Sequence, residues 1–172
     1  MANGNRFMDL SAIINSIQRA VSKAPIGVCP SNEAKKAFQD ALKEELYSNI
    51  PFVQTSDIEY NLSNLATHNG EGYNDKCDVY VETERYIVIV ELDATRADQV
   101  AKKMLSRYYY ANKCSKPMVY VCLLYPGTEK MSAPECVKYM NMGKDVLLSI
   151  NSSNRFIGAF INGNNIELKL IG

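Results

Sequence analysis

Two short runs rich in β-branched and aromatic residues, Asp78–Thr83 and Tyr86–Leu92, are separated by only two residues. Runs of this kind joined by a two-residue loop are typical of a tight β-hairpin. A loop of this length fixes the register of the pair and places Asp78 opposite Glu91. The second run has apolar residues at both odd and even positions, so both faces of that strand are expected to be covered.

The rest of the chain alternates between helical and extended patterns, which predicts an α/β fold. Four helices are expected: about Asp9–Lys23, from Ser31 or Asn32 to Pro51, from Thr95 to about Asn112, and from Ser132 to about Met142. In the third helix, Thr95 and Asp98 are expected to form a capping box. Further strands are expected at Phe52–Tyr60, Met118–Tyr125, Val146–Ile150, Arg155–Ile161 and Ile166–Ile171, with the last two forming a terminal hairpin. The order of strand, helix and strand predicts a parallel crossover from the first hairpin to Met118–Tyr125.

Three carboxylates are expected to converge at one end of the first hairpin. Asp78 and Glu91 share a sheet face because they lie opposite each other, and the two-residue period adds Asp93 to that face. Like charges so placed repel unless a cation or a shared proton lies between them. The pattern therefore predicts a metal site.

A fourth carboxylate, Glu45, occupies an unusual position on the second helix. The apolar stripe of that helix runs through Ala34, Phe38, Ala41 and Leu42, and one turn further it reaches Glu45. Burial of an unpaired charge is costly, so a carboxylate here is either functional or at the edge of the stripe and in contact with water. The sequence leaves both readings open.

The helix after the hairpin is expected to turn an apolar stripe toward the sheet and a basic face outward. The stripe contains Ala97, Val100, Ala101, Met104, Leu105 and Tyr108. The outer face carries Gln99, Lys102, Lys103, Ser106 and Arg107. Such a face is most often only solvated, but this one begins close to the acids, so Gln99, Lys103 and Arg107 are candidates to contact a phosphate backbone.

Composition narrows the class of protein without naming a function. The 172 residues fit a single domain, and with 47% apolar residues, 22% charged residues and a net charge of zero the chain is not expected to coat nucleic acid by bulk electrostatics. No apolar run reaches the roughly 20 residues that a membrane span needs, and no secretory signal is evident at the N-terminus. Five cysteines at irregular spacing favour reduced thiols and a cytoplasmic location.

The order of elements and the positions of the acids resemble the restriction-endonuclease-like superfamily, whose members carry a PD-(D/E)xK signature. The resemblance covers residues 32–125, so residues 1–31 form an added N-terminal helix and connector, and residues 126–172 form a C-terminal extension with a β-hairpin. Asp78 matches the signature aspartate, Glu91 matches the second acid, and Asp93 stands where the family has lysine. Glu45 matches an acid that many members carry on the preceding helix, and Gln99 matches a polar residue early in the next helix.

This resemblance implies a metal-dependent nuclease that hydrolyses phosphodiester bonds of DNA. Asp78, Glu91 and the carbonyl of Leu92 would hold Mg²⁺ or Mn²⁺, because hard cations prefer oxygen ligands. Asp93 would orient the attacking water or help to bind a second ion, and Glu45 would hold an outer-shell water or that second ion. In some members a lysine from the following helix replaces the signature lysine, and Lys102 or Lys103 could do so here.

Two other interpretations remain open. The chain could keep the nuclease fold without activity and bind DNA or a protein partner, since it lacks the signature lysine. It could also be an unrelated α/β domain whose acids are structural or bind a different ligand. A homodimer would suit the first interpretation, because two identical sites related by a two-fold axis can cut both strands.

Overall fold

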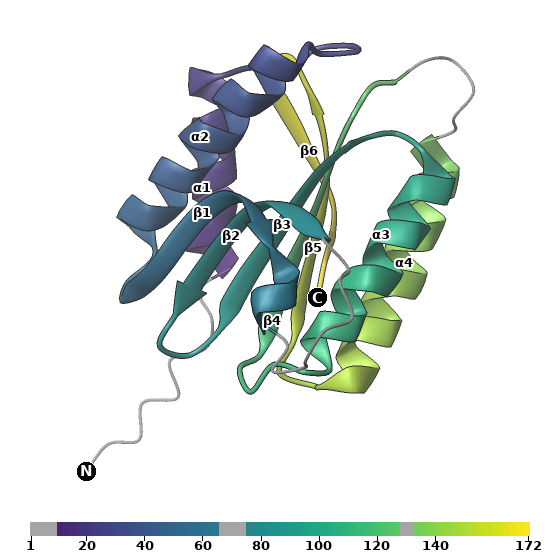
Figure 1. The fold of residues 1–172 in the computed structure, drawn as a ribbon. Coiled ribbons are helices and arrows are strands. Elements are labelled where there is room, and N and C mark those ends of the chain that lie inside the picture. The colour runs from purple at the N-terminus through teal and green to yellow at the C-terminus, as the bar shows by residue number, and fades with distance from the viewer. Residues whose placement is uncertain (1–9, 66–74, 128–132) are drawn as a thin grey trace.

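A computed structural model of the chain describes residues 10–65, 75–127 and 133–172, which form an α/β fold with four α-helices and a six-stranded mixed sheet (Figure 1). The elements are α1 (Leu10–Lys23), α2 (Asn32–Asn49), β1 (Val53–Asn61), the 3-10 turn η1 (Leu62–Leu65), β2 (Lys76–Thr83), β3 (Ile87–Ala94), α3 (Ala97–Ala111), β4 (Met118–Tyr125), α4 (Ala133–Ile150), β5 (Arg155–Asn162) and β6 (Asn165–Ile171). The helix starts predicted at Asp9 and Ser132 lie outside the described residues. Among the helices described, none is sufficiently long and apolar to cross a membrane.

The strands lie in the sheet in the order in which they occur in the chain. β1, β2 and β3 form an antiparallel meander, β3, β4 and β5 are mutually parallel, and β6 returns antiparallel to β5. The β2–β3 turn contains two residues, since the Thr83 amide donates to the Tyr86 carbonyl at 2.9 Å. The paired residues run from Glu82 with Ile87 to Val79 with Val90, which is the register that the sequence predicts, and Asp78 and Glu91 lie one position beyond the last pair.

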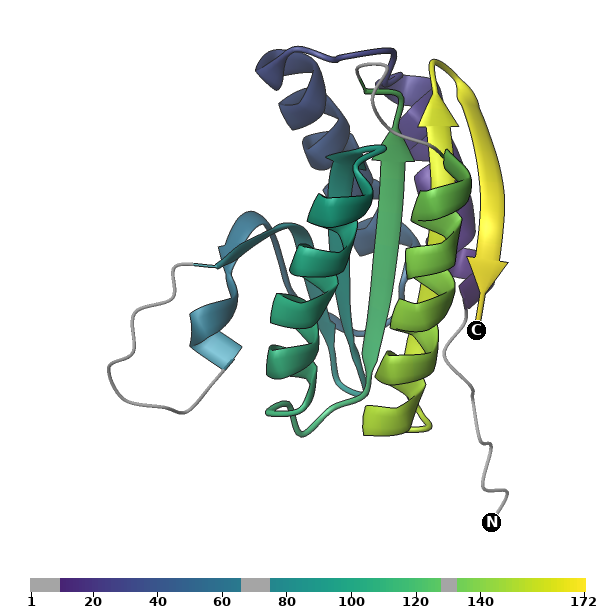
Figure 2. The same cartoon turned by 90° about the vertical axis from the view of Figure 1, so that its right-hand side faces the viewer.

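Two helical layers cover the two faces of the sheet. α1 and α2 pack on one face, and α3 and α4 lie side by side on the other (Figures 1 and 2). β3 contributes Val88 and Val90 to the core under α1 and α2, and Ile87 and Ile89 to the core under α3 and α4. The expectation that this strand is covered on both faces is therefore confirmed.

Helix α2 begins and ends where its sequence predicts. The Ser31 side chain accepts a hydrogen bond from the Ala34 amide at 3.2 Å, which satisfies one of the free amides of the first turn. The helix ends at Asn49, two residues before Pro51. Because Pro51 lacks an amide proton and restricts the residue before it, a helix is expected to stop here.

Two predictions about local structure are wrong. Val146–Ile150 is not a strand but the last part of α4, because Leu147 continues a buried helical stripe that starts at Cys136. Thr95 does not cap α3, whose N-cap is Arg96 without a side-chain hydrogen bond. The Thr95 amide instead donates to the Tyr125 carbonyl at 2.9 Å, so the chain stays paired with β4 before the helix begins.

Helices α3 and α4 approach each other closely at Gly143. A Cβ atom at this position would overlap the Met104 sulfur and lie 2.9 Å from the Tyr108 hydroxyl. Both neighbours are buried, so neither can move into solvent. The absence of a side chain at Gly143 is therefore what allows the two helices to pack at this distance.

We expect Gly143→Ala to lower the free energy of unfolding by about 1 kcal/mol, measured by urea denaturation. Overpacking of a core costs about 1–3 kcal/mol, and the better helix propensity of alanine offsets about 1 kcal/mol of that cost. Gly27→Ala is the matched control, because a Cβ there has no neighbour within 4 Å. A Gly143→Ala protein that is more stable than wild type would contradict this account of the helix contact.

Candidate functional site

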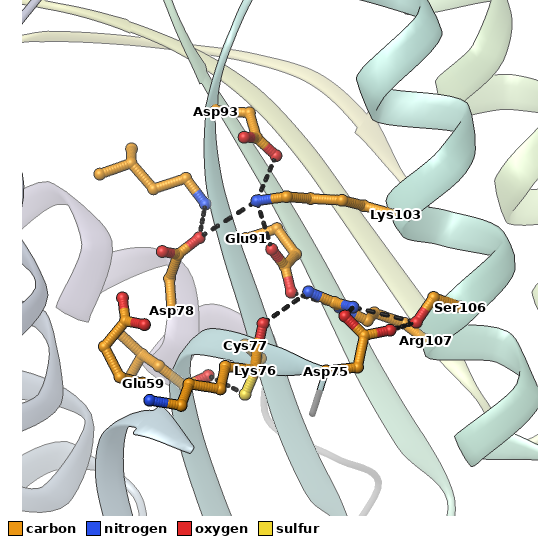
Figure 3. A network of polar contacts seen from close by, with 12 residues as sticks. Glu59, Asp75, Lys76, Cys77, Asp78, Glu91, Asp93, Lys103, Ser106 and Arg107 are labelled. Atoms are coloured by element: carbon orange, nitrogen blue, oxygen red, sulfur yellow. Dashed lines mark hydrogen bonds and ion pairs between the residues drawn. The ribbon is translucent and has the colours of Figure 1, made fainter. Parts of the chain in front are cut away.

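The three hairpin acids gather around one lysine at an end of the sheet (Figure 3). Lys103 Nζ on α3 lies 2.9 Å from Glu91 Oε2, 2.9 Å from Asp93 Oδ2 and 3.8 Å from Asp78 Oδ2. Glu91 and Asp93 continue the face of β3 that carries Ile89, and this face is the one that α3 covers. The strand period therefore directs both acids toward α3, and we call these four side chains the acid cluster.

The carboxylate of Asp78 is held from two sides. Its Oδ2 accepts a hydrogen bond from the Leu92 amide of β3 at 2.7 Å, and its Oδ1 accepts one from Gln39 Nε2 of α2 at 2.7 Å. Gln39 also lies 3.4 Å from a carboxylate oxygen of Glu59, which adopts a positive φ of 51° in β1. Asp78 therefore links the helical layer of α2 to the end of β3.

Glu91 and Arg107 form a buried ion pair behind the acid cluster. Only 1% of the Glu91 side chain and 2% of the Arg107 side chain are exposed, and Arg107 Nε donates to Glu91 Oε1 at 2.5 Å. The same guanidinium pairs with Asp75 at 2.7 Å and donates to the Lys76 carbonyl at 2.7 Å. Arg107 thus joins α3 to the start of β2 as well as to β3 (Figure 3).

The side chain of Ser106 completes this part of the network. Its hydroxyl donates to the Asp75 carboxylate and accepts a hydrogen bond from Arg107 at 3.0 Å. Asp75 is therefore held by two adjacent residues of α3, at the point where the chain enters β2.

Burial and charge act in opposite directions on the pKa values of these groups. Burial raises the pKa of Glu91 to about 7, although Lys103 and Arg107 act against the shift. Burial also raises the pKa of Asp93, again against Lys103. For Lys103, burial alone would lower the pKa, but Glu91, Asp78 and Asp93 together raise it, so the ammonium stays charged.

The donor atoms of the acid cluster fit a hard divalent cation, but their arrangement does not yet form a metal site. Within residues 10–65, 75–127 and 133–172, no three Asp, Glu, His or Cys side chains are placed to hold a metal ion. Lys103 Nζ lies among the carboxylates instead. Glu91 Oε2 is buried and makes no hydrogen bond, although it lies within ion-pair distance of that ammonium. The partner of this buried oxygen among the described residues is therefore the Lys103 ammonium, through charge and not through a hydrogen bond.

The two lysines that could replace the signature lysine are placed differently. Lys103 reaches all three acids, whereas Lys102 is exposed on the outer surface of α3. Gln99 donates to its neighbour Asp98 at 3.2 Å, and among the described residues it makes no hydrogen bond with Asp78, Glu91 or Asp93. The structure therefore brings only Lys103 of these three residues into the acid cluster.

The expectation for the faces of α3 is confirmed for Lys102, which is exposed, and wrong for Lys103, Arg107 and Leu105. Leu105 is 76% exposed, while Arg107 is buried and Lys103 points at the acids. The acids at the strand end pair with both cations, so charge as well as the apolar contacts of Val100, Met104 and Tyr108 fixes the rotation of this helix. Arg107 consequently does not present its guanidinium at the surface for the phosphate contact that was predicted for it.

Glu45 is buried, with 7% of the residue exposed, but it does not face the acid cluster. Its carboxylate pairs with Lys23 at 2.5 Å and lies 3.8 Å from Arg19, both on α1. Asn49 donates a further hydrogen bond at 3.1 Å. Here the residue of α2 that reaches the cluster is Gln39, not Glu45.

Sequence reasoning missed four participants: Gln39, Asp75, Ser106 and the Lys76 carbonyl. Gln39 carried a usable signal, because it directly follows Phe38 on the buried stripe of α2 and a buried amide needs partners. Asp75 and the Lys76 carbonyl carried no such sequence signal, because they follow a polar segment without periodicity.

Arg107→Met should destabilise the folded protein by about 3–5 kcal/mol, because removal of one partner leaves the other charge buried without its ion pair. Arg96→Met is the control, since the exposed Arg96–Asp98 pair is worth at most about 1 kcal/mol. Adding Glu91→Gln to Arg107→Met should recover most of the loss, because the buried charge is then absent. Urea denaturation of the three variants measures this, and equal losses for Arg107→Met and Arg96→Met would contradict it.

The pairing of Glu45 predicts a pH dependence of stability. A hydrogen bond from Lys23 lowers the pKa of Glu45 below its ordinary value of 4.5. The unfolded chain therefore binds this proton more tightly, so the stabilisation is fully present above pH 4.5 and is lost as the pH falls through the lowered pKa.

We expect the difference in unfolding free energy between wild type and Glu45→Gln to shrink as the pH is lowered from about 6 to about 3. Glu44→Gln serves as the control for loss of a glutamate at the exposed neighbouring position. Thermal or urea unfolding at several pH values measures both differences. A difference for Glu45→Gln that stays constant over this range would show that the pair with Lys23 does not form in solution.

No protein-family model and no curated protein matches the chain. Among solved structures, the chain matches SfsA from Pyrococcus furiosus in complex with Ca²⁺, at 12% sequence identity and a TM-score of 0.38. The match covers 81% of this chain and 61% of that chain, so this chain spans about 61% of the length of that protein. A match of this extent identifies no family, and the resemblance to the restriction-endonuclease-like superfamily stays a prediction from the residues of this chain.

Proposed function

We propose that this protein is a metal-dependent nuclease that hydrolyses phosphodiester bonds of DNA. The observation that carries the proposal is the convergence of Asp78, Glu91 and Asp93 from two paired strands on one ammonium group. The order of helix, three-stranded meander, helix and parallel strand supports a restriction-endonuclease-like core over residues 32–125. Residues 1–31 and 126–172 would be additions to this core within one domain.

The chemistry of the donor set supports a divalent cation. Asp78, Glu91 and the Leu92 carbonyl would hold Mg²⁺ or Mn²⁺, which prefer oxygen ligands. When bound, such an ion supplies a more acidic water and neutralises charge on a phosphate. Glu91 Oε2 is buried, makes no hydrogen bond and pairs with Lys103 at 2.9 Å, so a cation that replaced this ammonium would find it as a ligand.

The remaining side chains of the site would act on the substrate or hold the ligands in place. Lys103 takes the role of the signature lysine from α3 and would bind the phosphate as its negative charge grows. Asp93 orients the attacking water. Gln39 and Arg107 are positioning residues, because they bind Asp78 and Glu91 and would not touch the substrate.

A second function is favoured by the same lysine. Lys103 already neutralises the acids, and as they stand no three described acid, histidine or cysteine side chains could hold a metal ion. A nuclease fold that has lost activity and binds DNA or a protein partner would keep such an internal ion pair for stability. The two functions differ in whether a divalent cation enters the acid cluster.

The nuclease proposal is tested with purified protein, DNA and Mg²⁺ or Mn²⁺. Wild type should nick or degrade single- or double-stranded DNA, and Asp78→Ala should lower the rate at least about a thousandfold if Asp78 is a metal ligand, a loss of the size seen when a major electrostatic group is removed. Asp145→Asn is the control, because that carboxylate is 75% exposed on α4.

Two outcomes would decide against cleavage. Equal rates for wild type and Asp78→Ala would assign the activity to a contaminant. DNA binding by wild type without cleavage across substrates and both metals would instead support the inactive binding module. Size measurements with and without DNA would show whether a homodimer forms.

A further inference from the structure

Lys103 occupies the position at the centre of the acid cluster that a cation would take. Its ammonium is within 2.9 Å of carboxylate oxygens of Glu91 and Asp93 and 3.8 Å from Asp78. No other described cation reaches all three acids: Arg107 pairs with Glu91 and Asp75 only. One side chain therefore supplies the charge that keeps these three carboxylates together.

We infer that Lys103 is a built-in competitor for the divalent cation, which must displace its ammonium from Asp78, Glu91 and Asp93 in order to bind. The inference rests on the proposed function in that it needs a metal to enter this site. It adds that Asp93 is a ligand or close neighbour of the metal, and that Lys103 sets the metal affinity.

The geometry at Glu91 also supports entry of a further ligand. Glu91 is 1% exposed, its Oε1 is bound by Arg107, and its Oε2 lies 2.9 Å from Lys103 Nζ but makes no hydrogen bond with it. An ammonium that sits in a site built for it would be expected to satisfy this oxygen. Lys103 therefore neutralises the charge of the acids but does not donate a hydrogen bond to Oε2 of Glu91, the most buried of them.

The net charge of the site is compatible with the binding of a divalent cation. Asp75, Asp78, Glu91 and Asp93 carry four negative charges when ionised, and Lys103 and Arg107 carry two positive charges, so the formal balance is minus two. A divalent ion would neutralise this balance with both basic residues still present. Displacement of Lys103 within the site is therefore electrostatically feasible.

Lys103 is more exposed than Arg107 and is held by fewer hydrogen bonds. The Lys103 side chain is 29% exposed and is held by its ion pairs and a hydrogen bond with Asp93, while Arg107 is 2% exposed and donates to Glu91, Ser106 and a backbone carbonyl. A lysine stem with four rotatable bonds can swing its ammonium to the rim of the site. There it would meet a phosphate bound to the metal, so metal entry would also deliver the lysine to the substrate.

The inference predicts that one substitution has opposite effects on binding and on cleavage. Lys103→Met should bind Mn²⁺ at least about tenfold more tightly than wild type, because an opposing charge at about 4 Å is removed from a site of low dielectric constant. The same variant, saturated with Mn²⁺, should cleave DNA more slowly than wild type. Isothermal titration with Mn²⁺ alone gives the affinities.

The controls separate this effect from a change in net charge. Lys102→Met removes the same charge from the exposed neighbouring position and should change the Mn²⁺ affinity by no more than about twofold, because exposed charges are screened. Lys103→Arg keeps the charge and should bind Mn²⁺ no more tightly than wild type. If Lys103→Met is unfolded without metal, recovery of its circular dichroism on addition of Mn²⁺ supports the inference, and failure to recover overturns it.

The outcomes distinguish the inference from the proposed function. Wild type that binds Mn²⁺ and cleaves DNA, together with a Lys103→Met variant that binds no more tightly, overturns the inference alone. Absence of Mn²⁺ binding by both wild type and Lys103→Met overturns the inference and the metal-dependent nuclease together. Tighter binding by Lys103→Met with no cleavage by wild type supports the inference and overturns the nuclease.

Discussion

The structure depends on the need to neutralise Glu91, a carboxylate that is almost completely buried. Removal of a carboxylate from water costs several kcal/mol unless cations and hydrogen bonds replace the hydration. Arg107 and Lys103 provide that replacement, and both come from α3. The helix therefore cannot rotate to bury Leu105 without withdrawing both cations from the acid. Its packing against the sheet is set by charge as much as by apolar contact.

The same constraint explains why the polar groups lie at one end of the sheet. β3 is apolar on both faces along most of its length, so a buried acid is tolerated only where the strand leaves the core. At that end the Leu92 amide binds Asp78, and Gln39 approaches from the other helical layer. Gln39 and Lys103 reach this end of the sheet from the middle of α2 and α3, whereas Asp78 lies near the start of β2 and Glu91 near the end of β3. Hydrogen bonds from Gln39, Arg107 and the Leu92 amide hold Asp78 and Glu91 in place.

The hairpin was predictable because its register depends on local rules. A two-residue turn and the strand period are enough to place Asp78 opposite Glu91 and on the side of Asp93, without knowledge of the rest of the fold. The apolar periodicity of α3 predicted the burial of Val100, Met104 and Tyr108 but not the exposure of Leu105. The inward positions of Lys103 and Arg107 depend on acids of another element, which the sequence of the helix does not reveal. For the same reason Glu45 could be assigned to the buried stripe but not to its partners on α1.

Position 93 carries an acid where the family that the sequence resembles has lysine. This difference in sequence has a direct counterpart in the structure of the acid cluster. An additional carboxylate there increases the repulsion within the acid cluster, and a cation must compensate for it wherever the fold can supply one. Lys103 does so from α3, at the same distance from Asp93 as from Glu91. A lysine on the strand would be fixed next to the acids, whereas a lysine on the helix reaches them through a flexible stem. Under the proposed function, the positive charge next to the acids is carried by a flexible side chain, and occupancy of the site by a metal would depend on where that charge lies.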